Sequence, residues 1–186
     1  SSNFIGVMAG YQATNAESSN FFGNWAGAGA LNANVSNFIG ENAGNLALNA
    51  TKANFIGNNA GRDAVDAQSS NFFGFGAGRF AREAFQSNFI GDGAGQGAVY
   101  ANNSNFIGAG AGFGASDPYV LGGVFGVDVY GAAFSNFIGT QAGEGAIHAF
   151  QSVFVGHKAG YLAEDAYNSN FIGFETGMGA INAESA

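Results

Sequence analysis

One 17-residue unit recurs along nearly the whole chain, with the consensus Asn-Phe-(Ile/Phe/Val)-Gly-x-x-Ala-Gly-x-x-Ala-x-x-Ala-x-x-Ser. Ten units are counted by their first residue, which is Asn3, Asn20, Asn37, Asn54, Asn71, Asn88, Asn105, Asn136, Val153 and Asn170. Each step is 17 residues except one of 31, where about 14 additional residues have entered. A unit this short cannot bury a core alone, so the units must stack as the coils of a solenoid do. The sequence therefore predicts that residues 1–186 form one rod-shaped repeat array.

The composition fits a packed repeat array and no other fibrous or disordered class. The chain has 32 glycines, one proline and 20 phenylalanines, and its glycines do not recur at every third residue as they do in collagen. An apolar content of 47% is too high for a disordered chain. The first residues, Ser1-Ser2-Asn3, are already in phase with the repeat, which indicates a piece of a longer array or a processed product.

The charge and the apolar runs exclude two classes of partner. Thirteen acidic residues against five basic ones give a net charge of −8, which repels phosphate backbones, so we expect no nucleic-acid partner. The longest apolar stretch, Tyr119 to Phe134, is interrupted by Asp128 and is shorter than the roughly 20 residues that cross a bilayer. We therefore expect no membrane span.

The segment Ser-Asn-Phe-Ile-Gly is the best strand candidate in each unit, because aromatic and β-branched residues are followed by a closing glycine. Successive side chains of a strand point to opposite faces. One face then carries a phenylalanine ladder of Phe4, Phe21, Phe38, Phe55, Phe72, Phe89, Phe106, Phe137, Phe154 and Phe171. The other face carries Ile5, Phe22, Ile39, Ile56, Phe73, Ile90, Ile107, Ile138, Val155 and Ile172.

Both faces of this strand are apolar, whereas a single solenoid coil has only one interior. Burying one such side chain contributes roughly 1.5–3 kcal/mol, so an exposed ladder of ten would forgo on the order of 15–30 kcal/mol. The second ladder is therefore expected to pack against other copies of the chain or against another layer of the same coil.

The rest of the unit, Ala-Gly-x-x-Ala-x-x-Ala, allows two interpretations. Alanines spaced by four and three residues could mark a short helix, as Ala43, Ala47 and Ala50 do. Against a helix stand the glycine after the first alanine and the frequent glycines two residues later, each costing about 1 kcal/mol in a helix. An all-β coil of two strands, with glycines at the corners and alanines where backbones approach closely, fits better, and a strand-plus-helix coil remains the alternative.

Parallel stacking at about 4.8 Å per coil would make a rod roughly 48 Å long, with like residues above like. The first residue of the unit then forms an amide ladder, because asparagine can bond to the copies above and below it. This ladder consists of Asn3, Asn20, Asn37, Asn54, Asn71, Asn88, Asn105, Asn136 and Asn170. Its expected role is structural.

The phrase Asn-Phe-Ile-Gly-x-x-Ala-Gly, as at residues 37–44 and 54–61, resembles the repeats of phage tail-fibre shafts. It is similar, more loosely, to the head repeats of trimeric autotransporter adhesins, which are shorter than 17 residues. The resemblance implies a β-solenoid, typically trimeric with an apolar seam along the shared axis, outside the cell or on a virion. No receptor-binding tip, membrane anchor or chaperone domain of those families can be matched here.

The residues that carry chemistry form no recognisable site. The glycine-rich runs recur with the repeat and lack the lysine of a phosphate-binding loop. His148 and His157 are the only histidines, the chain has no cysteine, and both histidines occupy variable places typical of a solvated edge. No aspartate recurs in every coil as calcium-binding rolls require. We expect no catalytic, cofactor or metal site, and no enzyme.

The insertion runs from Ser116 to about Ala133, within the seventh unit, and contains the only proline, Pro118. It breaks the pattern without breaking the register. One interpretation is an excursion packed over a neighbouring coil or chain. The other is a contact loop, since binding often lies on loops of rigid scaffolds. Its expected anchors are Tyr119, Phe125 and Tyr130.

These observations predict a structural protein of an extracellular fibre, cell surface or virion, which associates with itself as a trimer or a filament. The alternative is an adhesin or receptor-binding segment whose variable positions contact a host surface or a glycan.

Overall fold

The structure is a computed structural model that describes residues 1–115 and 132–185. It contains ten three-residue strands: β1 (Asn3–Ile5), β2 (Asn20–Phe22), β3 (Asn37–Ile39), β4 (Asn54–Ile56), β5 (Asn71–Phe73), β6 (Asn88–Ile90), β7 (Asn105–Ile107), β8 (Asn136–Ile138), β9 (Val153–Val155) and β10 (Asn170–Ile172). Most of the insertion, with Tyr119, Phe125 and Tyr130, lies outside the described residues. We number the coils 1 to 10 after their strands and the places in a unit 1 to 17 from the asparagine.

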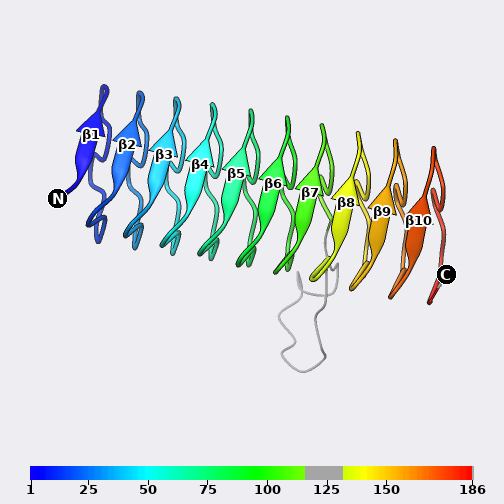
Figure 1. The fold of residues 1–186 in the computed structure, drawn as a ribbon. Helices are drawn as coiled ribbons and strands as arrows, with labels where there is room; N and C mark the ends of the chain where they lie inside the picture. Colours follow the sequence, from blue (N-terminus) through cyan, green and yellow to red (C-terminus); the bar gives the residue numbers. More distant parts are fainter. Residues whose placement is uncertain (116–131, 186) are drawn as a thin grey trace.

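The strands form a single parallel sheet in the order β1 to β10, each paired in register with the strand one unit further along (Figure 1). The prediction of an all-β parallel solenoid of 17-residue coils is confirmed. No helix occurs among the described residues, so the strand-plus-helix coil is wrong for this part of the chain. Figure 1 shows the coils following one another along a straight axis, with the termini at opposite ends of the rod.

The interior of each coil contains one phenylalanine ring surrounded by small residues. The rings stack along the axis with centroids 4.6–4.9 Å apart, so the column extends about 43 Å. From Phe21 to Phe154 every ring of this column is fully buried. Alanines at places 7, 11 and 14 and the serine at place 17 complete the core.

Two glycines in each unit are dictated by close approach. A Cβ on Gly95, at place 8, would lie 2.2 Å from Cδ2 of Phe89, because the ring lies directly on the glycine backbone. Gly91, at place 4, ends the strand with φ +137°, and a Cβ there would lie 2.4 Å from the carbonyl oxygen of Gly108 in the next coil. Glycine alone meets both conditions without strain.

The return half of the coil consists of successive turns and not of a second continuous strand. In coil 2 the residues with positive φ are Gly23, Trp25, Gly27, Gly29, Asn32 and Val35. Turn hydrogen bonds such as Ala28 N–H to Trp25 O, 3.1 Å, link residues three apart. Because left-handed residues interrupt every extended run, the second strand is reduced to isolated bridges such as Leu31 to Leu48.

The chain regains its register after the insertion. The serine at place 17 normally bonds to a carbonyl 14 residues later, whereas Ser104 Oγ donates to the carbonyl of Ala132, 28 residues later, at 2.6 Å. The ring centroids of Phe106 and Phe137 are 4.8 Å apart, the same spacing as elsewhere. The described residues on either side of the insertion, Ala115 at place 11 and Ala132 at place 14, therefore belong to a coil that keeps the ordinary stacking.

The buried serines at place 17 link each coil to the next. Oγ of Ser87 donates to the carbonyl of Ala101, at 2.5 Å, and accepts the N–H of Ser104, at 3.1 Å. The same pair of bonds recurs along the column. Ala53 occupies this place in coil 3, so no hydroxyl bridges coils 3 and 4 there.

Ala53→Ser should stabilise the fold by about 1 kcal/mol, because the new hydroxyl can accept the N–H of Ser70 and donate to the carbonyl of Ala67. Thermal unfolding followed by circular dichroism measures the change. The matched control, Ser87→Ala, should cost about 1–3 kcal/mol, since it leaves the buried N–H of Ser104 without an acceptor. An unchanged melting temperature in both variants would show that the buried serine hydroxyls contribute nothing to stability.

Candidate functional surfaces

The side chains of the asparagine ladder hydrogen-bond to one another. Nδ2 of each asparagine donates to Oδ1 of the next at 2.8 Å, from Asn3 through Asn136. This row of side-chain hydrogen bonds ends at Asn136, because the next residue in the column is Val153. With donors and acceptors used along the axis, these amides hold the coils together and offer little to a ligand.

The second apolar ladder lies on the outside of the sheet, and we call it the outer column. Its isoleucines in the middle of the rod, from Ile39 to Ile138, are 37–40% exposed, while Phe22, Phe73 and Val155 are half-buried. No other layer of the described coils covers these side chains. The expectation that a second layer of the same coil would cover the outer column is wrong for these residues, because each coil contains only one strand and one return segment.

The opposite side of the coil, which we call the variable face, consists of places 5, 6, 9 and 10. The residues at these places vary from coil to coil and range in size from glycine to tryptophan. Two shallow cavities lie on this face. The first has a volume of about 310 Å³ and is lined by Ala109, Gly110, Phe113, Thr140, Gln141 and Glu144.

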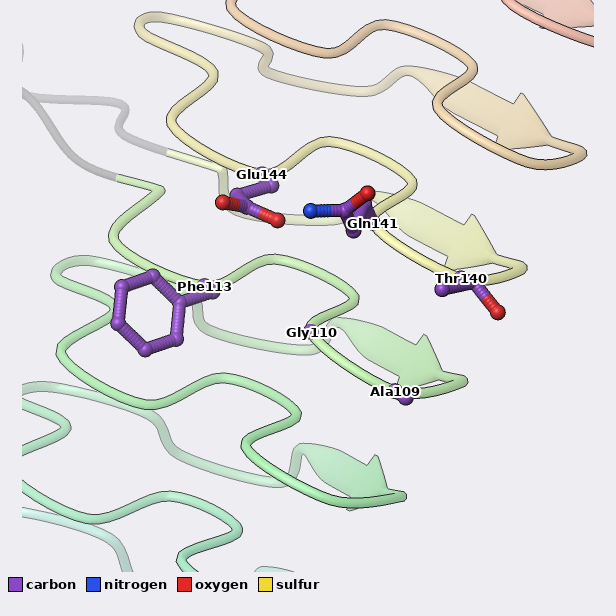
Figure 2. Close-up of a pocket in the computed structure, with 6 residues that line it drawn as sticks. All are labelled: Ala109, Gly110, Phe113, Thr140, Gln141 and Glu144. Carbon is purple, nitrogen blue, oxygen red and sulfur yellow. The ribbon is translucent and has the colours of Figure 1, made fainter.

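Figure 2 shows how the first cavity is arranged. The ring of Phe113 lies on one side, the side chains of Glu144 and Gln141 lie together on the neighbouring coil, and Thr140 points away from them. Phe113 is 41% exposed, and a Cβ on the neighbouring Gly114 would meet no atom within 4 Å. The glycines in this part of the face thus leave the backbone bare around one aromatic ring.

The second cavity lies on coils 1 to 4 of the same face and has a volume of about 320 Å³. Its lining residues include two exposed aromatic side chains, Tyr11 and Trp25, which are 49% and 42% exposed. Asn42, Asn45 and Arg62 line its other side. This cavity therefore combines aromatic surface with amide and guanidinium groups.

Place 13 forms a third polar ladder, which the sequence analysis missed. Hydrogen bonds from side-chain Nδ2 to Oδ1 join Asn15 to Asn32, Asn32 to Asn49, and Asn49 to Asp66, at 2.7–2.8 Å. Every residue of the ladder has positive φ, with values of 50–56° from Asn15 to Asp66. Asparagine and aspartate are the side chains that best tolerate this conformation. Their recurrence at place 13 was the available signal.

In coils 4 to 6 the place-13 ladder consists of the ionisable residues Asp66, Glu83 and Tyr100. Glu83 follows Asp66 in the column and hydrogen-bonds to Tyr100. Burial, the largest influence, raises the pKa of the Glu83 carboxyl, and the negative charge of Asp66 raises it further, while the bond from Tyr100 acts in the opposite direction. Glu83 is therefore an ionisable group held where its charge is disfavoured.

The two histidines have different surroundings. His148 belongs to the place-13 ladder, and its Nδ1 lies 2.6 Å from Oδ1 of Asp165, with only 12% of the His148 side chain exposed. This position differs from the expected solvated edge, because Asp165 and the ring of Tyr167, whose centroid is 6.0 Å away, lie beside the imidazole. His157 is exposed and stacks on Phe174, with centroids 5.1 Å apart.

Within residues 1–115 and 132–185 no three histidine, cysteine or acidic side chains gather as they would around a metal ion. The described residues also contain no helix that could serve as a membrane span. Comparison of the chain with known protein families and with curated proteins yields no match.

Glu83→Gln should raise the melting temperature at pH 7 by a few degrees. A carboxyl with a raised pKa binds its proton more tightly in the folded chain, so its stability contribution is greatest below the ordinary value of 4.5 and declines as the pH rises through the folded-state pKa. The advantage of the amide should therefore disappear below about pH 4.

Melting curves between pH 3 and 8 test this pH dependence. Glu17→Gln, at an exposed glutamate of coil 1, makes the same change in net charge and is the matched control. The same stabilisation by both substitutions would assign the effect to overall charge and not to Glu83.

Proposed function

We propose that the protein is a structural component of an extracellular fibre, and that rods associate side by side through the outer column. The observation that carries this proposal is the row of partly exposed apolar side chains, mostly isoleucines, along the outer face of the sheet. A hydrophobic stripe of this length is unusual on a soluble monomer and typical of a surface that becomes buried.

The size of the face supports association of whole rods. The strip of the sheet formed by places 1 to 3, with the asparagine ladder and the outer column, is about 43 Å long and about 10 Å wide, which gives about 430 Å². A stable interface buries about 800 Å² on each partner. Association should therefore strengthen as more coils are aligned, which suits a long fibre better than a compact dimer.

The regular 4.6–4.9 Å spacing allows like rods to match one another, but it also allows them to slip by one coil. Three departures from isoleucine interrupt the outer column in the body of the rod. Phe22 and Phe73 enlarge it in coils 2 and 5, and Val155 narrows it in coil 9. These differences give the face a shape that one alignment satisfies better than the others.

Our proposals for the number of chains and for the location are based on the resemblance of the repeat to those of trimeric fibre shafts. We propose three rods that bury their outer columns along a shared axis, outside the cell or on a virion. The second arrangement is end-to-end stacking of rods into a filament, which would extend the backbone hydrogen bonds that join one coil to the next within the rod.

Replacing two outer-column residues with lysine, in the double variant Ile56→Lys and Ile107→Lys, should abolish association while leaving the coil folded. Both side chains are 38–39% exposed in the single rod, so lysine can be accommodated there, but a charge buried between rods would be unpaired. Sedimentation velocity should show a multiple of 18.8 kDa for the parent chain and a monomer for the variant.

The matched control places lysine at two apolar residues away from the outer column, Leu31 and Leu162, which are 40% and 55% exposed. Arg82 and Asp63 already occupy the same places in other coils, so charge is tolerated there. The control should still associate. A parent chain that remains a monomer at about 100 µM, well above the Kd of ordinary stable interfaces, would contradict the proposal.

A further inference from the structure

The cavity on coils 1 to 4 of the variable face has the size of a single sugar ring. Its volume of about 320 Å³ lies at the lower end of the range for ligand cavities. Ala28 and Gly29 line it with almost no side chain, and Leu46 folds over Gly29, its Cδ2 only 2.7 Å from where a glycine Cβ would be. Tyr11 and Trp25 supply the aromatic surface.

The fold does not require a tryptophan at the place that Trp25 occupies. Its φ is +58°, which is unfavourable for a bulky residue, and 42% of its surface is exposed. The same place holds glycine in three consecutive coils, as Gly76, Gly93 and Gly110. Positive φ at this place is a feature of every coil, as at Met8, Gln141 and Lys158, so the exposed indole and not the backbone is what distinguishes coil 2.

The polar side chains around Trp25 are those that bind hydroxyl groups. Nδ2 of Asn45 donates to the backbone carbonyl of Trp25 at 3.3 Å, and both residues line the cavity. Asn42 adds a second amide, and primary amides both donate and accept. Arg62 adds a guanidinium whose Nη1 is only 3.4 Å from Oδ1 of Asn59, a long bond that a better acceptor could replace.

The charge of Arg62 is countered within the coil. Its Nε lies 3.2 Å from Oδ2 of Asp63, a contact without the direction of a hydrogen bond, since this Nε has no hydrogen-bond partner. The chain as a whole carries a net charge of −8. Both facts disfavour an anionic ligand and favour a neutral one.

We propose that this cavity binds one pyranose ring of a neutral glycan. The apolar face of the ring lies against the indole of Trp25, and its hydroxyls bond to Asn42, Asn45 and Arg62. The site lies on the variable face and not on the outer column, so the inference does not depend on lateral association of rods. A fibre with such a site would attach to a glycan-coated surface.

Trp25 is the only tryptophan of the chain, so its fluorescence reports on this cavity alone. We would titrate the full chain with the methyl β-glycosides of glucose, galactose and N-acetylglucosamine. At least one should shift the emission to shorter wavelength in a saturable way, with a Kd on the order of millimolar, as expected for one small ring. Sorbitol, which has hydroxyls but no ring face, should cause no shift.

Three variants test the named contacts. Asn45→Ala and Arg62→Ala should each weaken binding about tenfold, the effect of losing one good hydrogen bond. Trp25→Gly should melt at the same temperature or higher, because glycine suits the positive φ, and should lose binding in saturation-transfer NMR. Phe113→Ala, in the other cavity of the variable face, is the matched control and should bind as the parent does.

Several results would overturn the assignment. One is the absence of any saturable shift or saturation transfer up to about 50 mM sugar, far beyond the Kd expected of a single-ring site. Another is binding that survives Trp25→Gly or that Phe113→Ala weakens equally. A more than tenfold preference for methyl glucuronide over the neutral glycosides would show that the site selects anions, which contradicts the neutral class.

Discussion

The stacking of each phenylalanine on its neighbours and on a glycine backbone is the contact on which the rest of this structure depends. The centroids of Phe72 and Phe89 are 4.7 Å apart, which is also the spacing of hydrogen-bonded strands. Because Gly95 has no Cβ, the ring of Phe89 can lie against the return segment and the coil can be one side chain thick. A coil this thin has no room for a second layer, so the outer column remains outside.

The repeat made the architecture predictable, because its period sets the coil length and its alternation sets which side of the strand faces inward. The inward phenylalanines, the asparagine ladder and the place of the strand in the unit all follow from that, although each strand contains only the three middle residues of the five-residue candidate. The return segment was harder to predict, since its conformation depends on left-handed residues such as Trp25, Val35 and Leu46, whose types favour negative φ. Sequence alone gave no reason to expect turns in place of a second strand.

Of the two candidate functional surfaces, one could be predicted from the repeat and the other could not. The outer column was predictable as a pattern, because it repeats in every unit, whereas its degree of exposure needed the coil geometry. The cavity at Trp25 was not predictable, because its residues come from four coils and from places that vary between units. Repetition thus specifies how the rod is built, and the departures from repetition mark where rods differ and what they can recognise.

The claim that like residues stack in register along one axis is tested most directly by X-ray diffraction from an aligned sample of the protein. The account predicts a sharp reflection near 4.7 Å along the rod axis, from strands one coil apart. A pattern without that axial reflection, or with the roughly 5.4 Å pitch of α-helices, would contradict the stacked-coil structure and the surfaces inferred from it.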